Sequence, residues 1–303
     1  MPVACHNCGS TKTEDCFFGL TDREYNISGK FDFCRCKSCG VIFMSPTPEV
    51  DKLLSFYPSN YHGYCPPTSR LTRFLIRLNL KIRAQLYCRL IGRTGDILDI
   101  GSADGAHFDG LNEFGAWSFT GLEFNDQVAA EGRRVGRKIF TNTIEGHDFF
   151  SQKFDLIIMN HLIEHVADPN LTISSAASVL REGGYLVGET PNTDSFDFEI
   201  FKSYWGGLHT PRHTFLYNPP ALSQLLSRNG LRLKKIEFVL DTSHWALSIQ
   251  NFLQSYKVTK TKIRQGRTFY YPLLLAILIP INFCQQIFKK TGVMRFIAQK
   301  EKI

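Results

Sequence analysis

The chain has no apolar segment at its start that could act as a secretory signal, because residues 1–6 form no hydrophobic core. No internal repeat or low-complexity run is visible, which argues against a repeat array or a structureless tract. Hydrophobic residues make up 43% and charged residues 21%, an ordinary balance that excludes wholesale disorder. A length of 303 residues allows one main domain with a full core and smaller appendages.

The sequence contains nine cysteines, an odd number, and we expect no secretory signal. A disulfide framework is therefore a poor interpretation, and we expect a cytoplasmic protein. Four cysteines form two Cys-x-x-Cys pairs, Cys5 with Cys8 and Cys36 with Cys39. Each pair can form a tight knuckle that supplies half of a tetrahedral sulfur site, so we predict a zinc ion bound by these four thiolates.

The surroundings of these pairs refine that prediction. Gly9 and Gly40 follow the second cysteine of each pair, where a knuckle favours positive φ. Cys34 could replace Cys36 as a ligand, although the spacing favours Cys36, and reduced thiols in a small β-layer are the alternative to a metal. Four thiolates would leave no open coordination position, so the zinc is expected to be structural rather than catalytic.

A formal net charge of +7 favours anionic partners such as phosphorylated small molecules, nucleic acid or an acidic membrane face. A basic surface on an ordinary cytoplasmic protein explains this modest excess as well. Charge alone therefore does not select a partner.

The sequence Ser45-Pro-Thr-Pro48 marks the end of a first unit, since prolines continue neither a strand ladder nor a helix. We predict a zinc ribbon over residues 1–48, with short strands near 21–25, 31–34 and 41–44. Linking helices are expected over 49–95, a short one at 49–57 and a longer one at 68–91.

The longer helix is amphipathic. Its apolar stripe consists of Leu71, Phe74, Leu75, Leu78, Ile82, Leu86 and Leu90. Its other face carries Arg70, Arg73, Arg77, Lys81, Arg83 and Arg89. Such a helix can lie on anionic lipid or follow phosphates, but a solvated cationic face over a packed stripe is the more common arrangement.

Strand and helix patterns alternate from residue 96 onward, which implies an α/β fold with a parallel sheet. Strands are expected at 96–100, 117–123, 138–141, 154–160, 185–189 and 231–240, and helices at 105–114, 126–135, 170–181 and 219–229. Asp168-Pro169 and Asn218-Pro219 are helix-start signals, with a capping side chain followed by proline in the first turn.

The most informative segment is the strand at 97–100, which runs into a turn of small residues from Gly101 to Gly105 and then a helix. This geometry directs backbone N–H groups and a helix N-terminus at one point, where a nucleotide-like ligand can approach the main chain. Glu123 closes the next apolar strand, where a carboxylate can accept both hydroxyls of a ribose.

Four motifs carry a resemblance to class I S-adenosylmethionine-dependent methyltransferases, and it covers roughly residues 96–240. They are Asp-Ile-Gly-Ser-Ala-Asp-Gly at 99–105, Glu123, the segment 154–169, and the segment 183–192. The resemblance implies a Rossmann-like, seven-stranded, doubly wound sheet over 96–242 and 293–303, with the last strand at 293–299 antiparallel. One departure is Ala103, where the family usually has glycine.

The resemblance also implies a cofactor site at the carboxyl ends of the strands. The residues expected to hold S-adenosylmethionine are Asp99, Gly101, Ser102, Gly105, Glu123, Phe124, Asn142, Thr143, Asn160 and His161. Within this set, Glu123 is assigned to the ribose, and Asn160 and His161 are assigned to the methionine amine.

The candidate catalytic residues are histidines on the same rim, because histidine transfers protons near neutral pH. They are His161, His209 and His213, together with Glu164. In the loop 205–215 we expect Trp205 to form a platform for a sugar or base, Arg212 to bind a phosphate or carboxylate, and His213 to deprotonate a hydroxyl. The alternative is a tight loop that only packs on the sheet. His161 and His165 have the i, i+4 spacing of metal ligands, but Glu164-His165 matches a non-metal element of the family.

The segment 243–292 is predicted to be a helical insertion before the last strand. Its stretch 268–288 carries no charge and has the length of a spanning helix, but Pro272, Pro280 and three amide residues weaken that interpretation. A patch or hairpin lying on the membrane and an apolar helical lid are the main alternatives. We therefore expect residues 70–93 and 257–290 to be candidates for peripheral contact with an anionic inner membrane.

The zinc ribbon, the Pro-Thr-Pro boundary and the aromatic loop beginning at Tyr57-Pro58 resemble enzymes of bacterial surface-polysaccharide and deoxysugar pathways. The predicted function is methylation of an oxygen or carbon of a nucleotide- or lipid-linked sugar. One alternative is a ribosomal RNA base methyltransferase, although the few basic residues of the ribbon are interleaved with acidic ones, which disfavours nucleic acid as a partner. The other is a non-catalytic scaffold that binds the cofactor at a membrane.

Overall fold

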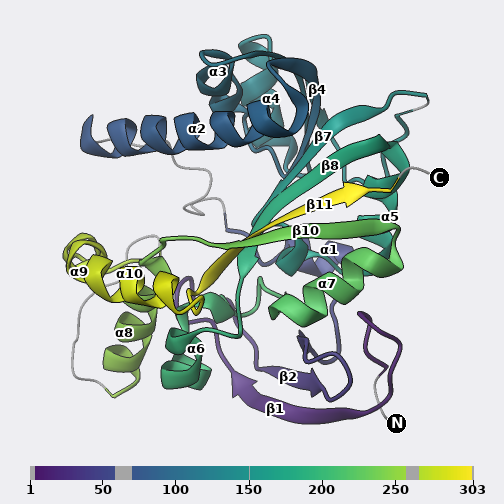
Figure 1. The fold of residues 1–303 in the computed structure, drawn as a ribbon. Coiled ribbons are helices and arrows are strands. Elements are labelled where there is room, and N and C mark those ends of the chain that lie inside the picture. The colour runs from purple at the N-terminus through teal and green to yellow at the C-terminus, as the bar shows by residue number, and fades with distance from the viewer. Residues whose placement is uncertain (1–3, 59–69, 150, 257–265, 302–303) are drawn as a thin grey trace.

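The computed structural model describes residues 4–58, 70–149, 151–256 and 266–301, and the statements below refer to these. Its centre is a seven-stranded sheet in the order β10-β11-β8-β7-β4-β5-β6 (Figure 1). The strands are β4 (Thr94–Ile100), β5 (Ala116–Glu123), β6 (Ile139–Thr141), β7 (Phe154–Asn160), β8 (Leu180–Pro191), β10 (Leu231–Phe238) and β11 (Val293–Lys300). Strands β4 to β8 pair in parallel, whereas β11 lies antiparallel between β8 and β10. This confirms the predicted Rossmann-like sheet with an antiparallel last strand.

Successive side chains of the central strands point to opposite faces, as the period of two in a strand requires. In β4, Ile97 belongs to one core cluster and Leu98 to the other. The same alternation holds for Leu156 and Ile157 in β7. Both faces are buried, which is why these strands read as continuous apolar runs in the sequence.

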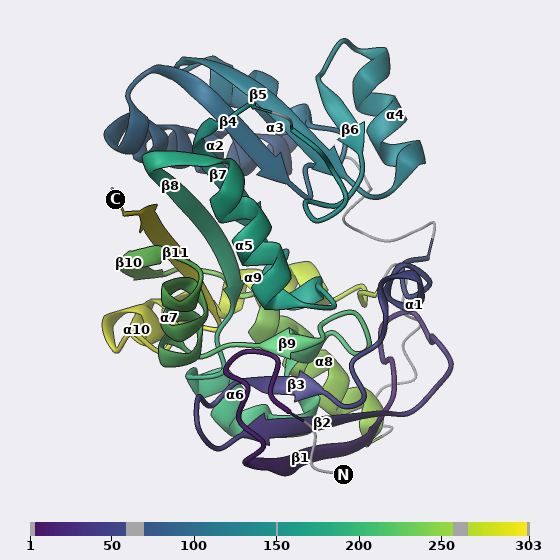
Figure 2. The same ribbon diagram turned by 90° about the vertical axis from the view of Figure 1, so that its right-hand side faces the viewer.

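Helices cover both faces of the sheet (Figures 1 and 2). One face is covered by α2 (Arg70–Ile91), α3 (Ala106–Asn112) and α4 (Asp126–Arg134), and the other by α5 (Pro169–Val179) and α7 (Pro219–Arg228). The helix starts follow the predicted signals: Asp168 and Asn218 cap α5 and α7, and each helix has proline in its first turn.

A second, four-stranded sheet is built mainly from the N-terminal unit, in the order β1-β2-β3-β9. Its strands are β1 (Thr13–Leu20), β2 (Phe31–Cys36), β3 (Ile42–Met44) and β9 (Phe215–Leu216). The predicted strand at 21–25 is wrong, because Asp22 instead accepts hydrogen bonds from the backbone N–H groups of Glu24 and Tyr25 and closes a loop. Since β9 follows the predicted acceptor loop, this sheet joins the N-terminal unit to the main domain.

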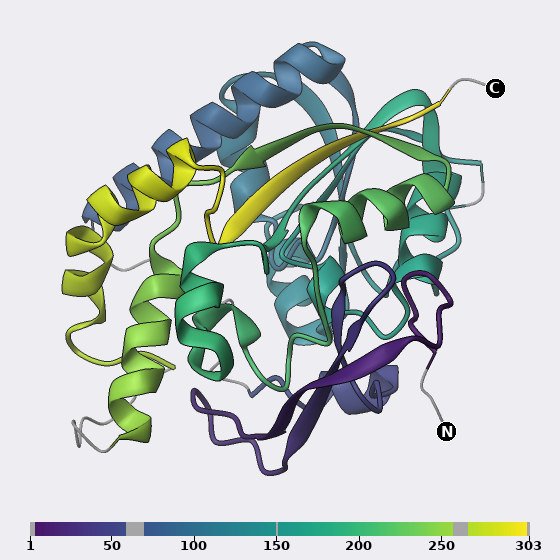
Figure 3. The same ribbon diagram turned by 60° about the horizontal axis from the view of Figure 1, so that its bottom comes forward.

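The first cysteine knuckle packs directly on the main domain. The side-chain amide of Asn7 is buried and donates to the carbonyl of Ala221 in α7 at 3.1 Å. The amide of Asn170 in α5 donates to the carbonyl of His6, and the His6 ring contacts Phe215 edge-on. The N-terminal unit is therefore docked on the sheet and helices rather than extended from them (Figure 3).

The long helix α2 packs in a different way from the prediction. Its second half is anchored by buried Ala84 and Tyr87 in the core cluster of α3 and α4. In its first half the predicted stripe is exposed, since Phe74 is 64% and Leu78 47% accessible. The helix extends beyond the edge of the sheet in this half (Figure 1).

The insertion between β10 and β11 is helical, as predicted. It contains α8 (Ser243–Ser255), α9 (Tyr271–Ile277) and α10 (Ile279–Ile287), and α9 and α10 each have proline in their first turn. Gln285 accepts a hydrogen bond from the Trp245 indole at 2.7 Å and donates one to Asp197 at 2.9 Å. The amides of the uncharged stretch thus tie α10 to α8 and to α6 (Phe196–Phe201). Within the described ranges, none of the helices combines the length and the apolar character needed to cross a bilayer.

Candidate active site

The small-residue turn after β4 has the backbone that the sequence predicted. Gly101, Ala103 and Gly105 have φ values of 79°, 50° and 67°, in the left-handed region. The N–H groups of Gly101 and Ser102 donate to the carbonyl of Leu122 at 2.8 and 3.0 Å, which fixes the turn against β5. Ala103 adopts this conformation at a cost of about 1 kcal/mol, because its Cβ approaches the carbonyl.

Glu123 lies at the end of β5 and closes the turn from the other side. Its carboxylate accepts hydrogen bonds from the N–H groups of Ala103 at 3.0 Å and Asn125 at 2.9 Å. Burial raises the pKa of the carboxyl, although these backbone donors partly oppose the rise. Each carboxylate oxygen has a second lone pair, so the group can still accept from ligand hydroxyls.

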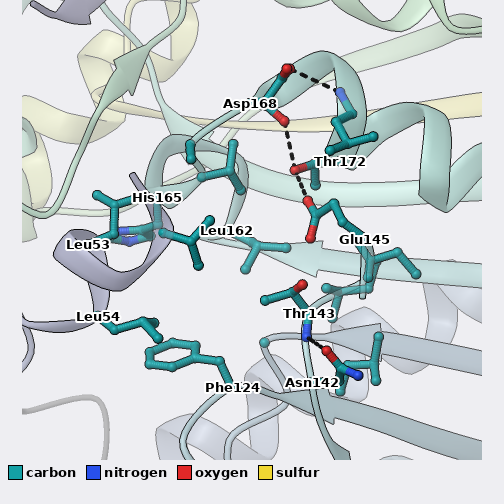
Figure 4. A pocket seen from close by; sticks show the side chains of 18 of the residues that line it. Leu53, Leu54, Phe124, Asn142, Thr143, Glu145, Leu162, His165, Asp168 and Thr172 are labelled. Atoms are coloured by element: carbon teal, nitrogen blue, oxygen red, sulfur yellow. Dashed lines mark hydrogen bonds between the residues drawn. The ribbon is translucent and has the colours of Figure 1, made fainter. Parts of the chain in front are cut away.

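The first of two adjoining pockets opens beside the turn and is mostly apolar (Figure 4). Its walls come from α1 (Val50–Leu54), the ends of β4 and β5, and the segments after β6 and β7. The predicted cofactor residues Gly101, Phe124, Asn142 and Thr143 line it. An aromatic ring beside amide and hydroxyl groups suits the flat, hydrogen-bonding face of an adenine.

The second pocket is rich in histidine and shares part of its wall with the first. The residues common to both are Tyr57, Gly101, Phe124, Leu162 and His165. The second pocket adds Ala103, Glu123, His161, His209, His213, Asp241, Ser243 and His244. One cleft thus leads from an apolar chamber, past the glycine turn and Glu123, to a polar chamber.

Several predicted site residues lie behind these walls rather than on them. Asp99 is buried and its carboxylate contacts Nε2 of His107 at 2.6 Å. The pockets are not lined by Ser102, Gly105, Asn160 or Glu164. Their direct contact with a cofactor or acceptor stays a prediction, and in this structure they support the residues in front of them.

His161 follows β7 and faces the polar chamber with a positive φ of 49° and a side chain that is 41% exposed. Its Nδ1 lies 3.2 Å from Glu164 and its Nε2 3.7 Å from Glu189. Burial disfavours charge on the ring, but the hydrogen bond to Glu164 and the two carboxylates outweigh it and raise the pKa to about 9. His161 is therefore a cation near neutral pH.

His165 and His213 are neutral, in contrast to His161. Nδ1 of His165 lies 3.0 Å from the carbonyl of Arg212, and Nδ1 of His213 lies 2.8 Å from the carbonyl of Gly207. A carbonyl only accepts, so we assign the ring proton to Nδ1 in both. Burial lowers the pKa of His165 to about 4 and that of His213 well below its usual value.

Glu164, His165 and His213 offer ligand atoms within 4.8 Å of one another, a grouping that could hold a cation. Glu164, however, already balances its charge against His161 and accepts a hydrogen bond from Thr190 at 2.9 Å. Charge balance thus requires no metal ion here.

Two predictions for the loop 205–215 are corrected by burial. Trp205 has no exposed surface, and its indole N–H donates to Asp197 at 2.7 Å, so it cannot form a platform for a ligand. Arg212 is also fully buried and binds Asp22 at 3.0 Å, which leaves it unable to meet a phosphate. The loop packs tightly, and only His209 and His213 of this segment reach the pocket.

The four predicted metal ligands lie together. Cys5 Sγ is 3.7 Å from Cys39 Sγ, and Cys8 Sγ is 3.5 Å from Cys36 Sγ. Sulfur atoms about 3.8 Å apart are what a tetrahedral ion with 2.3 Å bonds to sulfur requires. All four atoms fall within 4.8 Å of one another, so the donor set fits a tetrahedral metal.

Sequence reasoning missed several lining residues. Tyr57, Asp241, Ser243 and His244 come from segments outside the recognised motifs, and Leu53 comes from α1. Tyr57 was noted only as part of an aromatic loop, most of which lies outside the described residues. No local pattern marks these positions, because their shared place depends on how α1 and α8 fold over the sheet.

The charge on His161 predicts a pH dependence of stability. Folding raises the pKa of His161 from 6.5 to about 9. The protonated ring therefore stabilises the native state fully below pH 6.5, and this stabilisation is lost as the pH rises through about 9. We expect the difference in urea midpoint between wild type and His161→Asn to be largest at pH 6 and to shrink towards pH 10. Asparagine suits the positive φ. A difference that does not change with pH would contradict this assignment.

Comparison with known proteins identifies a family that matches the chain. A family described as methyltransferase domain matches residues 70–236, which is more than half of the 303 residues. A ubiquinone biosynthesis O-methyltransferase from Coxiella burnetii is 28% identical over 152 residues, covering 46% of this chain and 64% of that relative. One from Nitrobacter winogradskyi is 30% identical over 115 residues, covering 35% and 44%. The chain thus matches less than two thirds of the length of these relatives.

Solved structures support the fold alone. A candidate sarcosine dimethylglycine methyltransferase from Galdieria sulphuraria superposes with a TM-score of 0.52 at 12% identity, covering 75% of this chain and 86% of that one. The family match, the antiparallel last strand and the glycine turn facing Glu123 agree with one another. The chain belongs to the methyltransferase domain family.

Proposed function

We propose that this protein transfers a methyl group from S-adenosylmethionine to a hydroxylated small molecule, a nucleotide- or lipid-linked sugar. The observation that carries the proposal is the pair of adjoining chambers, one apolar beside the glycine turn and one lined by histidines. The first suits an adenosine and the second suits a molecule rich in hydroxyl groups.

The donor would be held by residues on the carboxyl ends of β4, β5 and β6. Glu123 would accept from the ribose hydroxyls, Phe124 would contact the adenine face, and Asn142 and Thr143 would lie at the adenine edge. S-adenosylmethionine supplies an electrophilic methyl group on a sulfonium. Because His161 is a cation near neutral pH, it suits the carboxylate of the methionine moiety better than its ammonium group.

The acceptor would occupy the polar chamber. His165 and His213 carry the proton on Nδ1, so the Nε2 atom of each ring can accept a hydrogen bond from an acceptor hydroxyl. Arg267 lines a further pocket that shares His209 and Ser243 with the polar chamber. A guanidinium there would suit the diphosphate of an activated sugar, in place of the buried Arg212.

The direct test uses the full chain with isotopically labelled donor and a panel of nucleoside-diphosphate and lipid-linked sugars. We expect one sugar class to gain a labelled methyl group by mass spectrometry. Ribosomal RNA and a ubiquinone-type phenol serve as competing acceptors. Labelling of either of these, with none of any sugar, would refute the sugar assignment.

Glu123→Ala should weaken donor binding. Loss of a hydrogen bond to a charged group costs roughly 1.5–3 kcal/mol, which is on the order of 10- to 150-fold in the dissociation constant. Calorimetric titration with S-adenosylhomocysteine measures this. Glu131→Ala, at an exposed position of α4, is the matched control, and equal affinities of the two variants would remove Glu123 from the ribose site.

We further propose that the four clustered cysteines bind a structural zinc ion. Tetrathiolate coordination leaves no open position for a substrate, and the knuckles lie against α5 and α7 rather than in the cleft. The metal would stabilise the small sheet that holds β9 and, through it, the end of the acceptor loop. A role in RNA binding has less support, since Asn7 and His6 of the first knuckle are engaged by the main domain.

Cys36→Ser should abolish stoichiometric zinc and lower the thermal unfolding temperature while leaving donor affinity in place, because no cysteine of the cluster lines the cleft. Metal content by mass spectrometry and calorimetric titration separate the two effects. Cys88→Ser, at a partly buried cysteine of α2, is the control. Full zinc content in Cys36→Ser would show that Cys34 or another ligand completes the site.

The exposed apolar surfaces of α2 and of α9 with α10 are proposed to contact an anionic membrane. The helices α2, α9 and α10 lie on the same side of the molecule (Figures 1 and 3). Their exposed residues are Phe74, Leu75, Ile76, Leu78 and Ile82, with Leu273, Ile277, Ile279, Ile281, Phe283 and Ile287. Arg70, Arg73 and Lys81 lie beside the first set, and basic residues beside apolar ones suit anionic lipid.

The wild-type chain should float with vesicles of phosphatidylglycerol and phosphatidylethanolamine and less with neutral vesicles. Phe74→Glu combined with Leu78→Glu should reduce flotation at least several-fold, because two charges would enter the apolar face. Val135→Glu, at an equally exposed apolar residue at the end of α4, should float like wild type. Wild-type protein that stays at the bottom with every vesicle would refute membrane contact.

A further inference from the structure

A carboxylate from the N-terminal unit contacts one histidine of the polar chamber. Oε1 of Glu24 lies 2.8 Å from Nδ1 of His209, and the two side chains are 6% and 13% exposed. His209 lines the polar chamber, and both residues line the pocket next to it. The contact joins the cysteine-bearing unit to the candidate catalytic rim.

Glu24 is held rigidly. The Asp22 carboxylate accepts from the N–H groups of Glu24 at 2.8 Å, Tyr25 at 3.1 Å and Ile27 at 3.2 Å. The buried guanidinium of Arg212 binds Asp22 at 3.0 Å and lies 3.6 Å from Glu24. Arg212, which sequence reasoning assigned to a phosphate, instead fastens this loop to the segment that carries His209.

His209 is constrained from its own side as well. Its backbone has a φ of 37°, a left-handed conformation that costs a non-glycine residue on the order of 1–3 kcal/mol and persists only where surrounding contacts impose it. Such conformations concentrate at functional sites, where they aim a side chain. Here the strained backbone turns the imidazole towards Glu24 on one side and the chamber on the other.

The other histidines of the chamber are less suited to accept a proton. His161 already carries one, because Glu164 and Glu189 raise its pKa. His165, His213 and His244 face backbone carbonyls through Nδ1, and burial lowers the pKa of each. His209, by contrast, lines the chamber and has the carboxylate of Glu24 at its Nδ1.

We propose that Glu24 positions His209 as the general base of the methyl transfer, so that the N-terminal unit completes the acceptor site. This inference rests on the proposed function. The acceptor proton passes to Nε2 of His209 while the acceptor atom forms a bond to the methyl carbon. The carbon–sulfur bond breaks, the sulfur keeps the electron pair as a neutral thioether, and the proton is released to water. Glu24 fixes the Nδ1–H tautomer and stabilises the imidazolium.

The contact has the distance of an ion pair, and the ring N–H is not aligned with the carboxylate. Catalytic hydrogen bonds are often poorly aligned before the acceptor binds and tighten in the complex.

The kinetic test uses zinc-loaded full-length protein and the nucleoside-diphosphate sugar with the highest turnover in the acceptor screen. Glu24→Gln should lower kcat on the order of 100-fold, the lower part of the range for general-base catalysis. KM for the sugar and the dissociation constant of S-adenosylhomocysteine should change less than about twofold. Glu14→Gln, at an exposed carboxylate of the same unit paired with Lys37, should keep wild-type kcat. Wild-type kcat in Glu24→Gln would overturn the inference.

A spectroscopic test needs no acceptor. Long-range 1H–15N correlation spectra report which imidazole nitrogen carries the proton, and His209→Asn assigns the signal. In wild type bound to S-adenosylhomocysteine, neutral His209 should carry its proton on Nδ1, whereas Glu24→Ala should show a mixture of tautomers. Unchanged tautomers would overturn the positioning role. If wild type methylates no acceptor, the proposed function fails and these spectra alone decide whether Glu24 positions His209.

Discussion

The arrangement of the site depends on one geometric constraint: β4, β5 and β7 run in parallel and end at the same edge of the sheet. Residues that follow each strand are therefore brought together, although they are distant in the chain. The turn at Gly101, the carboxylate of Glu123 and the imidazole of His161 all line one chamber for this reason. Both faces of these strands are buried, so the site is built on the core of the molecule.

Charge is distributed unevenly within the histidine-lined chamber. Glu189 binds Arg295 at 2.7 Å and Arg83 at 3.0 Å. The positive charges of these two arginines and of His161 outweigh the effect of burial and lower the pKa of Glu189 to about 2. That network lies behind His161 and helps to keep it protonated. On the other wall, burial lowers the pKa of His165 and His213 more than their contacts with backbone carbonyls raise it, and both rings are neutral. Histidine thus provides both a cation and neutral hydrogen-bond acceptors within a single cleft. Different surroundings give side chains of the same type different roles in proton transfer.

The N-terminal unit is part of the cleft rather than an appendage. Burying the Arg212 guanidinium would be costly alone, and Asp22 together with Glu24 compensates it. The cysteine knuckles hold β2 and β3, β3 pairs with β9, and β9 follows the loop that carries His209 and His213. The proposed metal site and the proposed acceptor chamber are thereby linked through contiguous structure, although no cysteine of the cluster lines the cleft.

Local patterns could predict much of the fold. Apolar runs and helix-start signals located the strands and helices of the main domain, because each buried strand and each capped helix leaves its mark within a few residues. The two Cys-x-x-Cys pairs likewise identified a cluster that the structure brings together. Patterns could not say what a helix packs against, and the first half of α2 proved exposed because it extends past the sheet.

The sequence by itself determined the order and type of most strands and helices of the main domain, since hydrophobic periodicity and capping act over a few residues. Tertiary structure alone decided which polar side chains meet. It buried Trp205 and Arg212, which had looked available for a ligand, and brought Glu24 to His209 from a loop predicted to be a strand. Such pairings depend on how the N-terminal unit docks on the sheet, and docking is set by shape and charge across surfaces that no local pattern encodes.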